Sequence, residues 1–409
     1  MYRNIKVKLT LVISILALGL GLVGCGKQPA VNQNVDVNAN ISQSQNDKEN
    51  KVIINEPDFL FARQNGNYSI WAMKIDDFVQ NLVIDELKIG NIESVTLSPT
   101  KDLIAYVSLE KTEKSGAVVR PREFGLRIID LKNNEETLIG SWDRDEVQVG
   151  GYLKFSPDGQ YLFYYLENLD DNSLYLNILQ LSDYKTKIVK KISLDDNNIS
   201  YGEMDWSDDS KSIVFIYNNA VHITDLLGND TKIVDGEMLM PVKSIYNDEI
   251  TYHPILSRPV FSNNSDIVYQ KAEPLKDSEG KWATNIYLYK PKEKTTKKIV
   301  NNDNPLSRLR ICDKFPYSNE LLVSNSWSNK ESDFFSDDPY YNEKFLLYNL
   351  DTNILTELYQ GTRFHNPKIL SSDNLLVEDI SYGSDAGIYI MSIPNLEVKR
   401  LTNGQDRLR

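Results

Sequence analysis

Residues 154–166 read KFSPDGQYLFYYL, and this stretch decides the fold. A short segment that alternates apolar and polar residues leads into a polar turn, and an aromatic-rich segment follows it. Pro157 presets φ for the turn, Asp158 can hydrogen-bond its own backbone, and Gly159 accepts the positive φ that other residues avoid. The stretch therefore predicts two antiparallel strands joined by a tight turn.

Degraded copies of this pattern recur along the chain. The serine of the turn is found at six positions that are 51 to 58 residues apart: Ser98, Ser156, Ser207, Ser262, Ser318 and Ser371. A third apolar strand follows each copy, as at 285–289 and 387–393, and a fourth is visible at 297–300 and 398–402. A repeat of this length with four strands per unit is typical of a β-propeller. We therefore expect an all-β protein made of four-stranded antiparallel blades.

The number of blades follows from the length of the repeat. Residues 52–409 exceed six repeats with a mean length of 54.6 residues, so we searched for a seventh unit. It is predicted at the start of this region, with strands at 52–54, 59–63 and 68–74. A single propeller of seven blades is expected over residues 52–409, and six blades are the alternative. The mode of ring closure stays open, although residues 405–409 could supply an inner strand to the first blade.

Three elements of the repeat resemble a known family. The FSPDG turn at 155–159, the strands NIYLY at 285–289 and GIYIM at 387–391, and the closing VKRLTNG at 398–404 resemble the TolB-type, WD40-like propeller repeat. Related repeats occur in the propeller domain of prolyl-oligopeptidase-like peptidases. The resemblance covers roughly residues 52–404 and implies the architecture, together with a role in an envelope assembly. It implies little about activity, because one fold hosts many functions.

The first residues predict export. A basic head, an apolar run at 9–23 and small residues at its end indicate a secretory signal peptide over residues 1–24. The sequence LVGC at 22–25 resembles the lipobox of bacterial lipoproteins, which implies cleavage before Cys25 and lipid attachment to its sulfur. An uncleaved N-terminal anchor is the alternative. Both interpretations place the remainder outside the cytoplasm, on a bacterial cell membrane, with residues 25–51 as a flexible polar tether.

Charge and cysteine usage restrict the partners. The formal net charge is −13, and it becomes −16 once the three basic residues of the signal peptide are removed. An acidic chain without a basic patch excludes nucleic acid and anionic membrane surfaces as partners. If Cys25 is lipidated, Cys312 has no partner for an intrachain disulfide, so we expect it to be a small buried apolar side chain. No cofactor is expected, and the propeller is predicted to be monomeric.

One face of the expected propeller carries the insertions. In a blade, the turn between the first two strands lies on one face, and the connections from second to third strand and from blade to blade lie on the other. Insertions at 109–124, 141–151, 235–258, 271–283 and 326–344 all belong to the second face. Long loops on a rigid scaffold are common sites of binding. We therefore expect a protein, peptide or cell-envelope glycan to bind there.

Arginines and aromatic residues, which often anchor binding partners, are the candidate residues on this face. They are Arg120, Arg122, Trp142, Arg144, Tyr252, His253, Trp282, Trp327, Phe334, Phe335, Tyr340, Tyr341 and His365. Any single aromatic residue could instead hold its loop against the body of the propeller.

The residues favour binding over catalysis. The three histidines are far apart in sequence, without an H-E-x-x-H motif, and no G-x-S-x-G elbow is present. His222 is predicted to pack inside a strand, whereas His253 and His365 lie in or near connections between blades. Similar repeats occur in metal-dependent oligogalacturonate lyases, so a polysaccharide lyase or hydrolase is one alternative; it would need these two histidines to converge with carboxylates. A structural module of an envelope complex is another. Four acids at 333–343 lack the spacing of a calcium loop, and no metal site is predicted.

Overall fold

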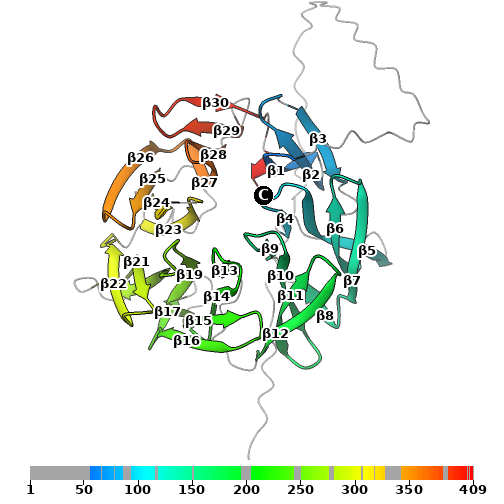
Figure 1. Ribbon diagram of the computed structural model, residues 1–409, viewed down its shortest axis with the longest axis horizontal. Helices are drawn as coiled ribbons and strands as arrows, with labels where there is room; N and C mark the ends of the chain where they lie inside the picture. Colours follow the sequence, from blue (N-terminus) through cyan, green and yellow to red (C-terminus); the bar gives the residue numbers. More distant parts are fainter. Residues whose placement is uncertain are drawn as a thin grey trace, which may run out of the picture. The chain divides into compact units, whose positions relative to one another are not determined.

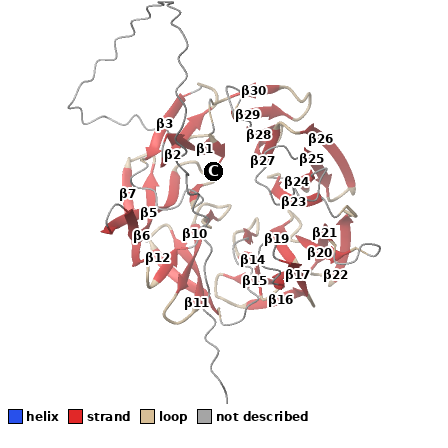
Figure 2. Cartoon of the chain, turned by 180° about the vertical axis from the view of Figure 1, so that it is seen from behind, coloured by secondary structure: helices blue, strands red, loops and turns tan. Residues whose placement is uncertain are grey.

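The chain divides into two units, residues 1–50 and 51–409. The residues that the computed structural model describes all belong to the second unit: 56–65, 67–77, 79–85, 94–115, 118–149, 152–194, 204–243, 250–275, 281–304, 307–316, 318–327, 342–380, 386–402, 404 and 406–408. The predicted signal peptide, Cys25 and the tether therefore lie outside the described residues. All the regular secondary structure of the described part is β-strand (Figure 2). This part contains no helix long and apolar enough to span a membrane.

Seven antiparallel sheets surround a common axis as the blades of a β-propeller (Figure 1). The first blade has the order β3-β2-β1-β31, from β1 (Phe59–Asn65), β2 (Asn67–Lys74), β3 (Val79–Ile84) and β31 (Arg407–Leu408). The second has the order β4-β5-β6-β7, from β4 (Val95–Leu97), β5 (Leu103–Ser115), β6 (Val118–Asp130) and β7 (Glu135–Asp143). The prediction of seven four-stranded blades is confirmed.

The third blade divides its innermost position between two short strands. It consists of β8 (Val147–Val149), β9 (Lys154–Phe155), β10 (Tyr161–Asn168), β11 (Ser173–Gln180) and β12 (Lys185–Ser193). Both β8 and β9 pair with the same edge of β10, at opposite ends of that strand. The blade therefore remains four strands deep.

The remaining four blades follow the same order from the inner strand to the outer strand. The fourth comprises β13 (Met204–Trp206), β14 (Ser212–Tyr217), β15 (Ala220–Asp225) and β16 (Asp230–Asp235). The fifth comprises β19 (Leu256–Phe261), β20 (Ile267–Pro274), β21 (Trp282–Lys290) and β22 (Thr295–Val300). The sixth comprises β23 (Ser307–Lys314), β24 (Glu320–Trp327), β25 (Asn342–Asn349) and β26 (Ile354–Gly361). The seventh comprises β27 (Phe364–Ser371), β28 (Asn374–Asp379), β29 (Gly387–Ser392) and β30 (Val398–Arg400). A separate hairpin, β17 (Leu239–Lys243) with β18 (Ile250–Pro254), lies between the fourth and fifth blades in the chain.

The repeating serine has a structural role at the turn between the first two strands of a blade. The Ser156 N–H donates to the Tyr161 carbonyl at 2.9 Å, and the Ser156 Oγ accepts the Tyr161 N–H at 3.0 Å. Ser98 makes the same pair of bonds with Leu103, at 2.8 and 2.9 Å. Ser207 does so with Ser212, at 2.9 Å for both bonds. The serine thus closes the turn and satisfies backbone groups that burial would otherwise leave unpaired.

The third residue after each of these serines has a left-handed backbone. Gly159 has φ of 68°, and the equivalent residues Lys101, Ser210 and Ser265 have φ of 59°, 58° and 62°. The predicted positive φ of Gly159 is confirmed, and the Gln160 N–H bonds the Asp158 carboxylate at 3.0 Å as that prediction requires. Of these four copies, only one places glycine here, which explains why the other three look degraded in sequence although their turns are equivalent.

Seven apolar clusters fill the spaces between neighbouring blades. Each joins residues of two successive blades, and the last joins the seventh blade to the first through Leu376, Ile388, Phe61 and Leu408. Burial of apolar surface between the sheets, at about 25 cal/mol per Å², is therefore distributed around the whole ring. Cys312 packs, half-buried, against the cluster between the sixth and seventh blades, and burial raises its thiol pKa.

The ring closes through residues from the two ends of the described region. β31 pairs with β1, at Phe61 with Leu408, and forms the innermost strand of the first blade (Figure 1). Arg63 donates to both carboxylate oxygens of Asp406, at 3.1 and 2.9 Å. The Leu408 N–H donates to the buried Glu378 at 2.6 Å. Residues 52–54, the predicted first strand of this blade, lie outside the described residues, and the inner position belongs to β31.

Candidate binding face

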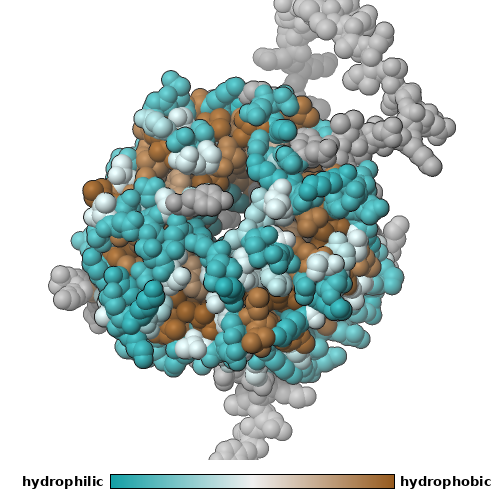
Figure 3. All heavy atoms as spheres, viewed as in Figure 1, coloured by the Kyte–Doolittle hydropathy of each residue, from teal (hydrophilic) through white to brown (hydrophobic). Residues whose placement is uncertain are grey.

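The two faces of the propeller differ in how their connections are built. One face, called here the turn face, carries the short serine-closed turns and the turns from third to fourth strand. The other, called the insertion face, carries the connections from second to third strand and from blade to blade. In the space-filling view, hydrophilic residues cover most of the visible surface and hydrophobic residues lie in separate groups among them (Figure 3). The face seen in Figure 3 therefore carries no large continuous apolar patch among its described residues.

The insertion predicted at 109–124 is a long hairpin instead of a loop. β5 and β6 pair from Leu103–Asp130 outward to Ser115–Val118, with register shifts around Lys111. Arg127 donates to both oxygens of Glu110, at 2.7 and 2.8 Å, and stiffens the base of the hairpin. The rule that a long insertion is a loop was wrong here, because the alternating residues continue the ladder beyond the body of the blade.

Arg122 lies on this hairpin and is held by acidic residues. Its guanidinium contacts Asp143 at 2.7 Å and Asp145 at 2.8 Å, and 44% of its side chain is exposed. These carboxylates raise the pKa of Arg122. Arg120 lies opposite Glu113 in the β5–β6 register, and its side chain is outside the described residues.

Trp142 lies near the end of β7, and Arg144 follows directly after that strand. Trp142 packs against the apolar cluster between the second and third blades, with its ring 6.5 Å from that of Tyr164. The Arg144 N–H donates to the Arg122 carbonyl at 2.9 Å, which joins this connection to the hairpin. Trp142 is thus half-buried and fastens its connection to the body, as the alternative interpretation expects.

The other predicted aromatic residues divide between the body and the undescribed residues. Trp282 is half-buried against the cluster between the fourth and fifth blades, and Trp327 is half-buried at the end of β24, paired with Ser307. Phe334, Phe335, Tyr340 and Tyr341 lie outside the described residues.

The histidines are distributed over three different sheets. His253 is exposed on β18, opposite Met240, beside Tyr252, whose side chain is not described. His365 is fully buried in β27, so it does not lie on an open surface as the candidate set expected. Its Nδ1 is 2.8 Å from Glu343 Oε2, and its Nε2 is 3.0 Å from the Thr362 carbonyl oxygen. Both ring nitrogens therefore have polar partners inside the protein.

Metal-binding geometry was sought among all described residues. They contain no group of three or more His, Cys, Asp and Glu side chains that could hold a metal ion. The arrangement that the lyase or hydrolase alternative requires, in which His253 and His365 converge with carboxylates, is therefore not found in this part of the chain.

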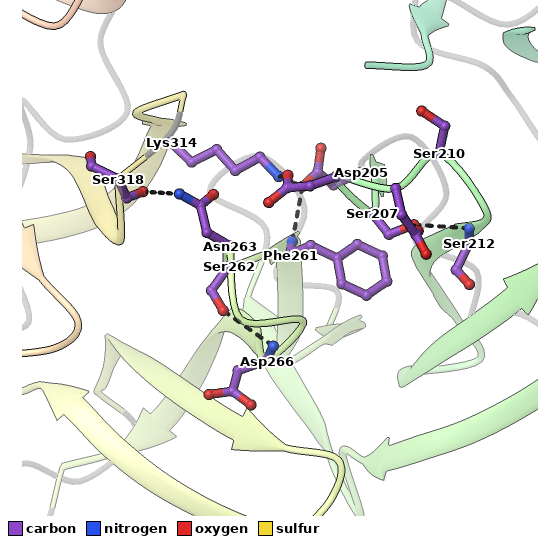
Figure 4. A network of polar contacts seen from close by, with 12 residues as sticks. Asp205, Ser207, Ser210, Ser212, Phe261, Ser262, Asn263, Asp266, Lys314 and Ser318 are labelled. Atoms are coloured by element: carbon purple, nitrogen blue, oxygen red, sulfur yellow. Dashed lines mark hydrogen bonds and ion pairs between the residues drawn. The ribbon is translucent and has the colours of Figure 1, made fainter. Parts of the chain in front are cut away.

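A charged network near the axis, on the side of the turn face, was not predicted from the sequence (Figure 4). The carboxylate of Asp205, 4% exposed, contacts Lys154 of the neighbouring blade at 2.7 Å and Lys314 of the sixth blade at 3.5 Å. It also accepts the Phe261 N–H at 2.9 Å. Lys314 reaches Asp208 at 2.6 Å as well. One carboxylate thus connects the inner strands of four blades.

Electrostatics keep this network ionised. Burial alone would raise the pKa of Asp205, but Lys154 and Lys314 hold it below its ordinary value. Burial opposes the charge of Lys154, yet Asp205 keeps the pKa of Lys154 above its usual range. Asp313, close to Lys154, has a pKa raised by burial. The sequence does contain a signal for this network. Lys154 and Asp205 both stand two residues before the repeating serine, in consecutive blades.

The comparisons with known proteins agree with this architecture. No protein-family model matches the chain, and no curated protein matches its sequence. An oligogalacturonate lyase in complex with manganese is similar with a TM-score of 0.54 and 10% identity, over 85% of this chain and 84% of that one. A Mycobacterium tuberculosis puromycin-hydrolyzing peptidase has a TM-score of 0.55 and 8% identity over 86% of this chain and 54% of its own. TolB from Acinetobacter baumannii has a TM-score of 0.44 and 12% identity, over 85% and 80%.

At these identities, the similarities show the fold alone. The chain is a seven-bladed β-propeller. Because this fold hosts many functions, the activity has to be argued from the side chains of this chain.

Proposed function

We propose that this protein is a lipid-anchored, extracytoplasmic propeller that binds a protein, peptide or glycan of the bacterial cell envelope through its insertion face. Lipid attachment at Cys25 would hold it at the membrane, and the polar residues 25–51 would carry the propeller away from it. The acidic net charge of −13 is compatible with such partners and disfavours binding to nucleic acid.

The observation that carries the proposal is the asymmetry between the two faces. The turn face is built from short turns whose polar groups are paired internally. The insertion face carries the β5–β6 hairpin, with strands of 13 residues each, and the β17–β18 hairpin. These hairpins extend beyond the regular blade, and the first presents the ionic side chain of Arg122. Projections on a rigid scaffold are suited to recognition, since little order has to be created on binding.

The test shortens one projection without disturbing the blade. Replacing residues 112–122 with Asn-Gly leaves Lys111 and Glu123, which pair in the β5–β6 register, flanking a two-residue hairpin turn. We expect the purified full-length protein to capture a partner from envelope extracts, and the shortened variant to lose at least about tenfold of that capture, the loss that about 1.4 kcal/mol produces.

The control changes the opposite face. Lys132→Ala removes an exposed cation from the turn between β6 and β7, where Lys132 pairs with Asp102 at 2.8 Å. Capture by this variant should equal that of the unaltered protein. Equal capture by the shortened hairpin would contradict the assignment of binding to the insertion face.

The anchor requires a separate test. Cys25→Ser should release the protein from the membrane fraction and abolish incorporation of labelled fatty acid. Membrane association that survives this substitution, without label in the unaltered protein, would favour the uncleaved anchor.

A further inference from the structure

A cavity of about 330 Å³ lies in the fourth blade, where β14, β15 and β16 reach the insertion face. Side chains of six residues that line it bear on its chemistry: Tyr217, Asn218, His222, Lys232, Asp235 and Glu237. This volume is at the lower end of the range of about 300–1,000 Å³ that is usual for small-molecule sites. It suits a ligand of one or two small rings.

The backbone around the cavity is fixed by local hydrogen bonds. Asn218 and Asn219, with φ of 47° and 49°, form the two-residue turn between β14 and β15. The Asn219 amide donates to the Met238 carbonyl at 2.6 Å and accepts the Ile255 N–H at 2.9 Å. Gly236 leaves no room for a side chain, since a Cβ there would lie 2.2 Å from the Asn219 amide nitrogen. The site is therefore largely formed before a ligand arrives, which lowers the cost of binding.

His222 lines the cavity and is held in place by its neighbours. Its Nδ1 lies 3.2 Å from both carboxylate oxygens of Asp230, and its ring lies 5.5 Å from Phe215 and 5.6 Å from Tyr217. Burial lowers the pKa of His222 even though Asp230 opposes the shift, so the imidazole is neutral near pH 7. Because Nδ1 then donates its proton to Asp230, Nε2 carries the lone pair. None of the His222 contacts within the described residues uses Nε2.

The charges of the cavity disfavour an anion. Lys232 pairs with Asp235 at 2.6 Å, and both side chains are 54% exposed. The Glu237 N–H donates to Asp235, while the Glu237 carboxylate makes no hydrogen bond or ion pair with any described residue. Two carboxylates and a neutral imidazole thus face one ammonium group. Such a lining accepts hydrogen bonds more than it donates them, which matches a ligand rich in hydroxyl groups.

From the lining and its charges, we propose that this cavity binds a neutral saccharide of one or two pyranose rings. Tyr217 would contact the C–H face of a ring, while His222 Nε2 and the Glu237 carboxylate accept hydroxyl protons and the Asn218 amide donates to a ring or hydroxyl oxygen. This inference deepens the proposed function, since it names a glycan as a ligand of the insertion face. A uronate would meet the repulsion of Asp235 and Glu237.

The experiment titrates the purified full-length protein with neutral disaccharides and one anionic disaccharide, observed by ligand NMR and calorimetry. The probes are maltose, cellobiose, N,N′-diacetylchitobiose and digalacturonate. At least one neutral disaccharide should bind with a dissociation constant of about 1 mM or tighter, as expected for an open site with few polar anchors. Digalacturonate should bind at least about tenfold more weakly.

The variants remove polar groups without changing the backbone. Asn218→Gly keeps a residue that tolerates positive φ and deletes the amide, and Glu237→Gln removes the charge of an exposed side chain. Each variant should weaken binding of the neutral saccharide about threefold to tenfold, and the double variant should weaken it more than tenfold. The matched control is Glu293→Gln, which makes the same change at an exposed position in the turn between β21 and β22. It should bind as the unaltered protein does.

Three results would overturn the inference: no neutral disaccharide binds, the double variant binds as tightly as the control, or digalacturonate binds more tightly than every neutral probe. Envelope capture separates these results from a failure of the proposed function. Capture that is lost on shortening the β5–β6 hairpin, together with no saccharide binding, rejects the saccharide site alone. Absence of capture by the unaltered protein rejects the proposed function.

Discussion

The turn face and the insertion face are built from the same strands but follow different rules. On the turn face, one device recurs: a serine closes the turn between the first two strands in the second to fifth blades, and Lys154, Asp205 and Lys314 connect inner strands of different blades. On the insertion face, each connection is individual, from the β5–β6 hairpin to the cavity beside Asn218. Repetition marks the features that every blade needs to fold, and departures from repetition mark the features that only this protein needs. Substitutions should therefore affect stability on one face and binding on the other.

The largest expected effect on stability comes from Asp205→Ala. This change leaves the Phe261 N–H and the Lys154 ammonium without their shared carboxylate. Asp205 is 4% exposed but Lys154 is 38% exposed, so the cost is at the lower end of the range for breaking a buried ion pair from one side, about 3 kcal/mol. Chemical denaturation should show the loss. Asp208→Ala, at the exposed end of the same network, should cost less than about 1 kcal/mol. Equal effects would mean that the network does not support the ring.

A smaller effect is expected from Asp205→Asn, and it should depend on pH. The pKa of Asp205 is lower in the folded protein than its ordinary value of 3.8, so the unfolded chain binds the proton more tightly. The stabilising effect is complete above that ordinary value and is lost as the pH falls through the folded pKa. The difference in unfolding free energy between the unaltered protein and the variant should be constant near pH 7 and shrink below about pH 4. A difference that grows toward acid pH would contradict this sign.

Ser156→Ala tests the recurrent turn. The Tyr161 N–H loses the Ser156 Oγ as acceptor in a buried turn, at a cost of about 1–2 kcal/mol. Ser182→Ala changes an exposed serine in the third blade and should leave stability within about 0.5 kcal/mol. Thermal unfolding of both variants gives the comparison, which fails if the two midpoints coincide.

Arg122→Ala should have the smallest effect on stability. Its ion pairs with Asp143 and Asp145 lie at the surface, so the free energy of unfolding should stay close to that of the unaltered protein. Capture from envelope extracts should nevertheless fall severalfold, as is usual for an arginine in a binding surface. A clear loss of stability with unchanged capture would place Arg122 in the scaffold instead.

The fold was predictable from the sequence because its determinants are local and repeated. The serine spacing gave the number of blades, and the FSPDG turn at 155–159 gave its own geometry, including the positive φ of Gly159. The closing strand was visible only as a possibility, because residues 405–409 carry no copy of the motif. In the third blade, β9 was predicted as part of the FSPDG stretch, whereas β8 has no sequence signal that distinguishes it from a loop.

The candidate site was less predictable because side-chain burial depends on neighbours distant in sequence. Trp142 and Trp282 were predicted to anchor a binding partner at the surface, yet both pack against apolar clusters between blades. His365 was predicted to lie near an open connection between blades. In the structure, its two ring nitrogens contact the Glu343 carboxylate and the Thr362 carbonyl. His222 was correctly expected inside a strand, but the cavity beside it depends on three strands and on Asn219. Only the assembled blade brings those groups together.

The pairing of β31 with β1 also sets an order of events in time. Arg63 and Asp406 are 343 positions apart, so the first blade reaches its full set of strands only after every later blade has been made. Contacts between such distant residues form slowly, because a very long loop has to close. A chain exported from its N-terminus would therefore complete its ring only once residues 406–408 have crossed the membrane. The last strand to arrive thus fixes the moment at which the ring closes.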